Sequence, residues 1–578
     1  MHDAPLPADP PPQADRRREL TLRAVLTAIV VAALIGASYP YVVLKIGYGP
    51  NISVVSAFFG YMALSAIGFV TGARTTRFET NLVQTAGTAA GQAGFMCVVL
   101  AAFDMLNAKP ELGFSVHLSS MQIFLWLSVA GLIGVLLAVP LRKHYIDEEN
   151  LTFADGTAAG ETLLVLDQGP KEAGPRVAAL GIGMGLSGFI AFLRDRPFKL
   201  LPEYLGFGAH GDALRMGTEV SLLSFGGGML VGMRIGLSMG LGMLLSWVIA
   251  PPLLFANNIV PAQTFREVVR WVMWPATGIL VAGGLTALFL KWKVVARSFS
   301  NFGARNVDGG DFPMRYVIGG VIVLSIVLCA LQKLSLGFPV WLTLVSLAVS
   351  AILMLVGTRV LGETNWAPVS ALANLTQALF AVLSPGHIAI NMIGSGMSGT
   401  VAANGEHLMQ DFKAGKIVGS SNRNLTILQL VGVPVGALAV ALVYPALKTR
   451  YGIGDTGLSS PISVKWAGFG ELVATGFSAL PRGCFAALGI AVALGIVITA
   501  LEPKHRRFVP SPTGIGIGML VPGIAVMPMV LGGIVQHLWS RANPRTENAY
   551  NLPLSSGFIA GEAIVVLVYA VLAMAGVV

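Results

Sequence analysis

Apolar stretches long enough to cross a lipid bilayer recur along this chain from end to end. A helix needs about 20 apolar residues to cross roughly 30 Å of hydrocarbon, and stretches of this kind lie at 22–45, 119–140 and 425–447, among other places. Hydrophobic residues make up 54% of the chain and charged residues 12%, whereas about a quarter of the residues in a soluble protein are charged. The sequence therefore predicts an all-α polytopic membrane protein with about 14–17 transmembrane or re-entrant helices.

The later part of the chain repeats motifs of the earlier part in the same order. The Gly-Glu pair of TAAGETLL at 157–164 returns in AGFGELVA at 467–474, and GGGMLVG at 226–232 returns as GIGMLVP at 516–522. Duplicated membrane units with helices interrupted at matching places are typical of secondary transporters. We therefore predict two internally duplicated halves with interrupted helices, and a transport function.

These repeats divide the chain into four predicted parts. They are a disordered cytoplasmic N-terminal tail at 1–21, a first transmembrane repeat at 22–292, a basic linker plus one extra transmembrane helix at 293–335, and a second transmembrane repeat at 336–578. Loop charges fit no single count of crossings, so the orientation of the second repeat stays open. We expect a multi-pass protein of the cytoplasmic (inner) membrane with its N-terminus in the cytoplasm.

The net charge of +9 comes largely from short basic loops beside apolar stretches, such as Arg142-Lys143-His144. This placement is typical of cytoplasmic loops in membrane proteins, so we predict no nucleic-acid partner. The expected partners are the lipid bilayer and a small-molecule or peptide substrate. The oligomeric state stays open, a homo-oligomer included.

The sequence offers no supported motif of an enzyme or a metal site. G-L-S-M-G at 236–240 matches the nucleophile-elbow string, but it lies in an apolar span with no strand before it. No G-x-x-x-x-G-K-[ST], H-E-x-x-H or C-x-x-C string occurs, so we predict neither ATP hydrolysis nor a metal site. The three cysteines, Cys97, Cys329 and Cys484, lie far apart in apolar segments and predict no disulfide framework. We therefore expect no enzyme activity and no cofactor, with a proton gradient as the energy source.

Three glutamates in apolar surroundings are the candidates for proton coupling. Glu161 and Glu471 occupy equivalent positions in the two repeats, each directly after a glycine, and Glu79 begins a polar run at 78–92. A carboxylate in a protein-lined site of low dielectric constant has a raised pKa and can load and release a proton. The alternative is a carboxylate at a helix end that caps backbone amides or faces loop water.

Polar side chains form a stripe in each predicted half. On a helix, positions 81, 84, 85 and 88 share one face. Such stripes either hold helices together or line a hydrated cavity, and we favour the cavity because two polar faces lie at related places in the two halves. Amides and hydroxyls suit the N–H and C=O groups of peptide-like molecules. The candidates for substrate binding are Asn81, Gln84, Thr85 and Thr88 in the first half and Asn391, Ser395, Ser398, Asn404 and Glu406 in the second.

Glycine-rich breaks and two isolated basic side chains complete the candidate set. Gly226, Gly227 and Gly228 are candidate walls of a substrate pathway, because unwound backbone at membrane depth is tolerated where it lines a cavity. Arg234 either binds a substrate carboxylate or pairs with a carboxylate such as Glu219. His387 is a candidate substrate contact, with a purely structural role as the alternative.

Six segments, found in the same order along the chain, resemble the oligopeptide transporter family and its relatives, the yellow-stripe-like carriers of metal chelates. They are NISVVSAFFGYM, TRFETNLVQTAGTAAGQ, LTFADGTAAGETLL, LLSFGGGMLVGMRIG, ANGEHLMQDFKAGKIVGSSNRNLTILQLVGVPVGA and SGFIAGEAIVVLV. The resemblance is to the prokaryotic branch of the family. It implies a proton-driven symporter that imports oligopeptides or peptide-derived small molecules. It also implies that the polar stripe and the segment 155–163, with Asp155, lie near the substrate path.

Two further functions stay open at this point. The family also transports metal–chelator complexes, and such a complex needs no protein ligands because the chelator supplies them. A membrane-embedded enzyme or a passive channel is a less favoured alternative, since no nucleophile, base or metal site converges in the sequence.

Overall fold

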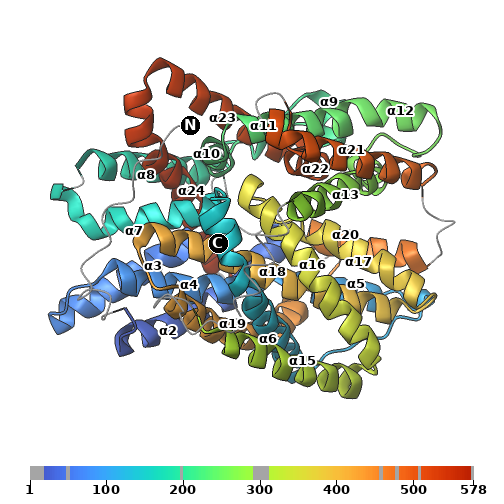
Figure 1. The fold of residues 1–578 in the computed structure, drawn as a ribbon, viewed down its shortest axis with the longest axis horizontal. Helices are drawn as coiled ribbons and strands as arrows, with labels where there is room; N and C mark the ends of the chain where they lie inside the picture. The colour runs from blue at the N-terminus through green and yellow to red at the C-terminus, as the bar shows by residue number, and fades with distance from the viewer. Residues whose placement is uncertain are drawn as a thin grey trace.

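The computed structural model is built almost wholly of helices (Figure 1). It describes residues 19–46, 52–172, 174–194, 199–290, 312–454, 458, 460–474, 481–505 and 509–574. Residues 1–18 of the predicted tail and most of the basic linker therefore lie outside the described residues. The α-helices up to the linker are α2 (Leu22–Ile46), α3 (Ile52–Thr71), α4 (Arg77–Phe95), α5 (Cys97–Asn107), α6 (Ser120–Ala138), α7 (Ala154–Glu172), α8 (Gly174–Arg194), α9 (Gly208–Ala213), α10 (Leu222–Val231), α11 (Met233–Met243), α12 (Ala250–Ala256) and α13 (Phe265–Leu290).

The remaining α-helices follow the linker. They are α15 (Met314–Leu336), α16 (Val340–Thr364), α17 (Val369–Leu383), α18 (Ile388–Val418), α19 (Asn422–Tyr451), α20 (Pro461–Ala474), α21 (Cys484–His505), α22 (Pro512–Leu520), α23 (Gly523–Ala542) and α24 (Pro544–Met574). Four short turns are 3-10 or π in type, namely η1 (Pro110–Leu112), η2 (Val139–Leu141), η3 (Lys143–Glu148) and η4 (Leu244–Ile249). Two short strands, β1 (Tyr204–Gly206) and β2 (Gly217–Glu219), pair antiparallel, with Tyr204 opposite Glu219.

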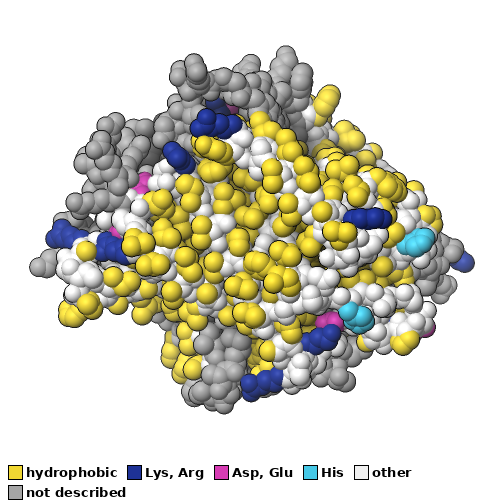
Figure 2. All heavy atoms as spheres, turned by 90° about the horizontal axis from the view of Figure 1, so that it is seen from below, with side chains coloured by type: hydrophobic (Ala, Val, Ile, Leu, Met, Phe, Trp, Pro, Cys, Tyr) yellow, Lys and Arg dark blue, Asp and Glu magenta, His cyan; other side chains and the backbone are white. Residues whose placement is uncertain are grey.

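Many of these helices are suited to a bilayer. Among the described residues, 11 helices are long and apolar enough to cross a membrane, and three more apolar helices are shorter. The surface in Figure 2 is covered mainly by hydrophobic side chains, and the few charged side chains are scattered among them. A hydrophobic surface of this extent faces lipid in a membrane protein. The predicted all-α polytopic class is confirmed.

Two helices are interrupted at matching places, as the repeated motifs predicted. Gly232 separates α10 from α11 with a φ of 88°, a backbone conformation that a side chain would strain. Val521 and Pro522 separate α22 from α23, and proline cannot donate the backbone hydrogen bond that would continue the helix. Ser221 and Ser511 occupy equivalent positions and accept a hydrogen bond from the backbone amides of Ser224 and Gly514.

The helices form two groups, and each group contains segments from both predicted repeats. The first group comprises α2–α7 and α15–α20, and the second comprises α8, α10–α13 and α21–α24; they occupy the lower and upper parts of Figure 1. Matching helices make matching contacts: α8 packs on α24 as α21 packs on α13, and α10 packs on α23 as α22 packs on α11. This is the contact pattern that the predicted duplication would produce, although the domain boundaries stay a prediction.

Helix α18 lies inside the first group. It packs against α4, α6, α7, α16, α17, α19 and α20, and most of its side chains are buried. Glycines permit this close packing: a Cβ at Gly134 of α6 would lie 2.1 Å from the carbonyl oxygen of Val401 in α18. The fold thus surrounds a helix rich in polar residues with other helices, and this arrangement positions the candidate site.

Candidate functional site

A buried carboxylate, Asp411, lies where α18 meets α4 and α19. Gln84 of α4 donates its side-chain amide to Asp411 Oδ1 at 2.6 Å, and Gln429 of α19 donates to Oδ2 at 2.7 Å. Asp411 is fully buried. Because both partners are neutral amides, this cluster can change its protonation state without breaking an ion pair.

The polar stripe predicted on α4 faces the same junction. Gln84 Nε2 also contacts Thr88 Oγ1 at 3.0 Å, and Asn81 donates to Ser420 Oγ at 2.7 Å. Thr85 bonds within α4, to the carbonyl oxygen of Asn81. All four stripe residues are buried. The structure therefore brings Gln84 and Thr88 directly to Asp411 and places Asn81 one turn away.

The N-terminal end of α7 joins α16 and α18 through a second polar cluster. Asn365, which ends α16 in a left-handed conformation, donates to Asp155 Oδ1 at 2.6 Å and accepts from the Asp155 backbone amide at 3.1 Å. Gln410 of α18 accepts from the Gly156 amide at 2.7 Å and donates to Asn365 Oδ1 at 3.2 Å. Since Gln410 precedes Asp411, Asp155 and the stripe converge on one stretch of α18.

Another buried carboxylate of α18, Glu406, lies about one turn before Asp411. Its side chain is fully buried, and neither oxygen has a hydrogen-bond partner among the described residues. The carboxylate rests on Gly357 of α16, where a Cβ would lie only 1.8 Å from Glu406 Oε1. Glycine at this position therefore makes the room that the carboxylate occupies.

An ionic network lies between α16, η3 and the N-terminal end of α22. Arg359 pairs with Glu149 at 2.5 Å and with Glu363 at 2.9 Å. Glu363 in turn accepts hydrogen bonds from Ser511, at 3.1 Å, and Thr513. The network thus links α16 of the first helix group to the interrupted helix α22 of the second.

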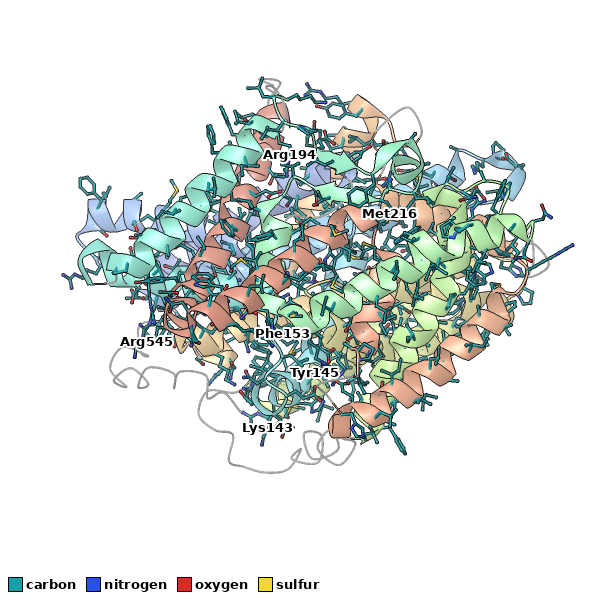
Figure 3. All side chains as sticks on the ribbon, turned by 90° about the horizontal axis from the view of Figure 1, so that it is seen from above. Lys143, Tyr145, Phe153, Arg194, Met216 and Arg545 are labelled. Atoms are coloured by element: carbon teal, nitrogen blue, oxygen red, sulfur yellow. The ribbon has the colours of Figure 1, made fainter. Side chains whose placement is uncertain are left out.

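The turn η3 is anchored beside this network. Figure 3 shows Lys143, Tyr145 and Phe153 near one another at one edge of the molecule. Tyr145 donates its hydroxyl to the Leu355 carbonyl at 2.8 Å, and the Phe153 amide donates to the Gly362 carbonyl at 2.9 Å. Both contacts bind the 143–153 segment to α16, which carries Gly357 and Glu363.

Polar residues nearer the start of α18 hold helices together in this conformation. Asn391 donates to the Gln377 carbonyl of α17 at 2.7 Å, and Ser395 accepts from the Trp466 indole of α20 at 3.1 Å. Ser398 donates to the Ser346 carbonyl of α16 at 3.2 Å, and Asn404 bonds within α18. All are buried. These contacts match the helix-joining alternative, and a role in substrate binding stays a prediction.

The glutamates predicted for proton coupling lie in different surroundings. Glu79 is held by Arg23 at 2.5 Å and by Thr21 near the start of α4. Glu161 is buried in α7, within electrostatic range of Arg176. Glu471 belongs to α20, but its side chain lies outside the described part of the structure. The structure does not bring Glu79 and Glu161 together with the Asp411 cluster.

The two basic candidates lie away from the Asp411 cluster. Arg234 of α11 pairs with Glu502 of α21 at 2.9 Å and donates to the Val509 carbonyl at 3.3 Å. The alternative of an internal pair was therefore the better interpretation, although the partner is not Glu219. His387 is exposed directly before α18, with Nδ1 at 3.0 Å from the Pro385 carbonyl oxygen.

The three consecutive glycines of α10 serve mainly as packing positions. A Cβ at Gly228 would lie 2.1 Å from the Met529 carbonyl of α23, and one at Gly226 would lie 2.8 Å from the Ser555 carbonyl of α24. A Cβ at Gly227, by contrast, would meet no atom within 4 Å among the described residues. Only Gly227 therefore leaves open space beside the helix.

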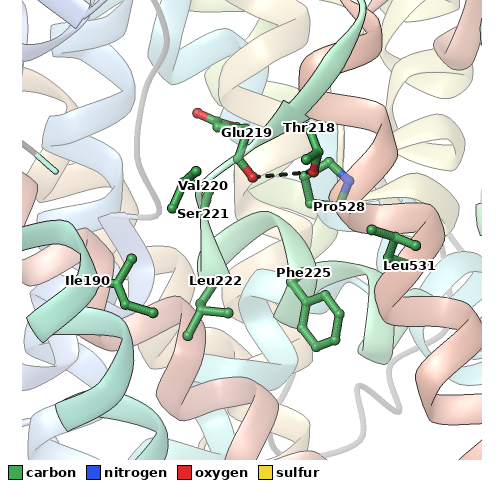
Figure 4. A pocket seen from close by; sticks show the side chains of 9 residues that line it. All are labelled: Ile190, Thr218, Glu219, Val220, Ser221, Leu222, Phe225, Pro528 and Leu531. Carbon is green, nitrogen blue, oxygen red and sulfur yellow. Dashed lines mark hydrogen bonds between the residues drawn. The ribbon is translucent and has the colours of Figure 1, made fainter. Parts of the chain in front are cut away.

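A small pocket of about 160 Å³ lies close to these glycines (Figure 4). It is lined by Ile190, Thr218, Glu219, Val220, Ser221, Leu222, Phe225, Pro528 and Leu531. Its lining is mostly apolar, and none of the predicted site residues is among the described residues that line it. The pocket is therefore separate from the polar centre around α18.

Sequence reasoning missed several residues of this centre. Asp411 was not among the predicted site residues, but it lies inside α18 and is buried there. Gln410 and Gln429 were not singled out. Helical spacing is the signal that could have found Asp411, since positions 404 and 411 are seven residues apart and share one face of a helix. Its amide partners lie on other helices and could not have been paired with it from spacing.

The side chains at this junction are mainly amides and carboxylates. The described residues contain no group of three or more His, Cys, Asp or Glu side chains that could hold a metal. Amide and carboxylate groups from α4, α7, α16, α18 and α19 instead offer donors and acceptors of the kind that recognise peptide-like groups. In this conformation these groups bond to one another.

Comparison with known proteins places this architecture in a family. Residues 19–573 match the family described as OPT oligopeptide transporter protein. The chain is 25% identical over 641 residues to a probable metal-nicotianamine transporter of Oryza sativa subsp. japonica, with 97% of this chain and 86% of the relative covered. It is 23% identical to the iron-phytosiderophore transporter yellow stripe 1 of Zea mays, with 99% and 95% covered.

A yeast protein is similar over the same extent. The chain is 22% identical to a putative oligopeptide transporter of Saccharomyces cerevisiae, with 95% of both chains covered. The family match spans nearly the whole chain and includes every helix described above. This protein is therefore a multi-pass membrane transporter that belongs to the oligopeptide transporter family.

Proposed function

We propose that this protein is a proton-coupled symporter of the cytoplasmic membrane that imports small peptide-like molecules, with metal–chelator complexes as the leading substrate class. The observation that carries the proposal is the pair of fully buried carboxylates on α18, Glu406 and Asp411, neither of which pairs with a cation among the described residues. An uncompensated charge is costly at membrane depth, and a carboxylate avoids that cost by binding a proton. A transporter that binds and releases such a proton in each cycle can draw on a proton gradient.

Similarity to named carriers supports a metal–chelator complex as the leading substrate. Relatives covered over nearly their full length are named metal-nicotianamine and iron-phytosiderophore transporters. Such a complex needs no metal ligands from the protein, because the chelator supplies them. The amides of Gln84, Gln410 and Gln429 would then meet the amine and carboxylate groups of the chelator.

Oligopeptides are the second candidate, favoured by the similarity to the yeast protein named a putative oligopeptide transporter. Peptides and amino-carboxylate chelators present similar donors and acceptors, so the polar centre around α18 suits both. The absence of a metal cluster does not distinguish them, because neither substrate requires one.

The test is uptake by the purified full-length protein in liposomes. An iron–nicotianamine complex and a labelled pool of di- to hexapeptides would be offered separately, with and without an inward proton gradient. We expect gradient-driven accumulation of the chelate, and its loss when a protonophore collapses the gradient. Protein-free liposomes serve as the control.

The other outcomes separate the candidates. Accumulation of peptides without accumulation of the chelate would show that oligopeptides are the substrates. Uptake that is indifferent to the gradient and reaches only equal concentrations would reject proton coupling and favour a passive channel.

A further inference from the structure

Glu406 differs from the other buried carboxylates because both of its oxygens lack a partner. It contributes the only carboxylate oxygens, among the described residues, that are buried without a hydrogen bond. A hydrogen-bonded or ion-paired carboxylate can keep its charge inside a protein, whereas an unpartnered one cannot without a large desolvation cost. The state of the protein described here is therefore one in which Glu406 is stable only with a proton.

Three other buried carboxylates, Asp411, Glu562 and Glu79, are committed to partners, and Glu161 lies within electrostatic range of Arg176. Asp411 receives an amide N–H on each oxygen, and Glu562 receives Arg194 at 2.8 Å together with the Ser221 hydroxyl. Glu79 is held by Arg23 and Thr21. Removing a proton from, or adding one to, any of these groups would alter a bonded cluster, whereas at Glu406 no described bond depends on the charge.

The space that holds Glu406 belongs to a helix that bridges the two helix groups. Gly357, on which the carboxylate rests, lies two residues before Arg359 and six before Glu363 on α16. Glu363 bonds to Ser511 and Thr513 at the start of the interrupted helix α22. A movement of α22 relative to the first helix group would therefore pull on α16 and change the surroundings of Glu406.

We infer that Glu406 is the group that carries the coupled proton. We also infer that the buried space beside Gly357, in which its carboxylate lies, opens to water and closes again as α16 moves with α22. This inference rests on the proposed proton-coupled function and names the residue that performs it. While this space is closed, one carboxylate oxygen of Glu406 holds the proton as an O–H group. When this space opens, that O–H bond breaks and the proton passes to water on the side of the membrane that has become accessible. One proton taken up on one side is thus released on the other in each cycle.

The charged groups that face this region have partners of their own. On α16 these are Arg359 and Glu363, which pair with each other, and on α7 it is Asp155, which bonds to Asn365. His144 of η3 lies 3.3 Å from Glu149, and His407, next to Glu406, lies 3.0 Å from the Ala403 carbonyl. Glu79, at the far end of α4, pairs with Arg23. None of them is bonded to Glu406.

The experiment compares wild type with Glu406→Gln, which keeps the size of the side chain and mimics the protonated acid. The full-length protein in liposomes would be assayed with the iron–nicotianamine complex in two ways, by gradient-driven accumulation and by counterflow against preloaded unlabelled complex without a gradient. We expect the variant to keep wild-type counterflow and to lose gradient-driven accumulation. For a one-proton symporter of a neutral substrate, the wild-type accumulation ratio is about tenfold per pH unit of gradient. Glu406→Asp should restore part of the accumulation.

Infrared spectroscopy tests whether Glu406 is protonated, and it needs no substrate. Infrared difference spectra of wild type and Glu406→Gln should show the carbonyl stretch of a protonated carboxylic acid in wild type only. Gly357→Ala, whose Cβ would meet Glu406 Oε1, should shift that band, and Glu267→Gln, at an exposed pair with Arg270, serves as the control that leaves it unchanged.

Three results would overturn the inference. These are accumulation by Glu406→Gln at the wild-type level, loss of counterflow together with accumulation, and an infrared spectrum in which the acid band is missing from wild type or survives in the variant. Failure of the proposed function looks different: wild type itself would then show no dependence on the gradient, while the acid band would still report on Glu406.

Discussion

Buried charged residues in this protein fall into two kinds at the scale of single side chains. Arg194 and Glu562 are both almost fully buried and lie 2.8 Å apart, and Glu562 also accepts hydrogen bonds from the Ser221 hydroxyl and the Leu223 amide. This carboxylate joins α24 to α8 and to the start of α10. Glu406, in contrast, bonds to nothing described. The first kind stabilises the fold, and the second is available for a change of charge.

The Arg194–Glu562 pair leads to a prediction about stability. Replacing Arg194 by Met leaves Glu562 as an unpaired buried charge, and removing one partner of a buried pair costs about 3–5 kcal/mol. We expect Arg194→Met to lower the thermal unfolding temperature in detergent markedly. Arg270→Met removes an exposed partner of Glu267 and is the matched control, with an expected cost of about 0–1 kcal/mol. Equal unfolding temperatures for the two variants would show that the buried pair has no structural role.

At the scale of helices, glycine positions set how closely the interrupted helices approach their neighbours. Gly228 faces the α23 backbone at a distance that leaves no room for a methyl group, while its neighbour Gly227 faces open space. The two residues lie in the same turn of α10 and differ only in what they face. They therefore separate the effect of close packing from the effect of helix propensity.

Gly228→Ala and Gly227→Ala should have opposite effects. A methyl group at 228 would meet the Met529 carbonyl oxygen and push α10 from α23, an overpacking that typically costs about 1–3 kcal/mol. A methyl group at 227 meets nothing, and alanine is favoured over glycine in a helix by about 0.8–1 kcal/mol. Thermal unfolding of the purified variants in detergent would measure both. A loss of stability at 227 as large as at 228 would contradict the packing explanation.

At the scale of the whole molecule, the two helix groups pack against each other through apolar side chains, and a few polar contacts also join them. The contact between Glu363 of α16 and the hydroxyls of Ser511 and Thr513 joins the groups at the start of α22. Trp366 adds a contact from its indole N–H to the Met529 sulfur, at 3.0 Å, just beyond α16. Alternating access in transporters of duplicated architecture requires one set of helices to move against the other. These contacts would have to break in each cycle.

A cross-link at this contact should stop transport. In a background in which Cys97, Cys329 and Cys484 are replaced, the double variant Glu363→Cys, Thr513→Cys should form a disulfide on oxidation and lose substrate uptake. A reducing agent should restore uptake, and Glu363→Cys alone should not respond to oxidation. Full uptake by the oxidised double variant, with the cross-link verified by mass spectrometry, would show that α16 and α22 do not separate during the cycle.

Much of the architecture could be predicted from local features of the sequence. The apolar stretches predicted an all-α polytopic protein, and the repeated glycine-rich motifs predicted interrupted helices. The structure contains the interruptions a few residues later, at Gly232 and at Pro522, whereas Gly226, Gly227 and Gly228 themselves are helical. The polar stripe on α4 was identified from helical spacing alone. These predictions succeed because hydropathy, helix periodicity and backbone breaks depend on residues that are neighbours in the sequence.

The roles of the charged side chains could not be predicted in the same way. Arg234 was considered with Glu219, which is 15 positions away in the chain, but its partner Glu502 is 268 positions away. Asp411 was not among the predicted site residues, yet it is the centre of a cluster that includes Gln84, 327 positions earlier. Partner choice depends on which helices pack together, and packing is a property of the folded chain.

The sequence by itself determined that this protein is a helical membrane transporter of the oligopeptide transporter family, because the length of its apolar segments and the order of its motifs carry that information. Only the tertiary structure decided which carboxylates are paired and which is not. Glu406 and Glu79 look alike in the sequence, but one lies against a bare glycine and the other against an arginine. The cost of a buried charge is set by these neighbours, which the fold brings from distant helices.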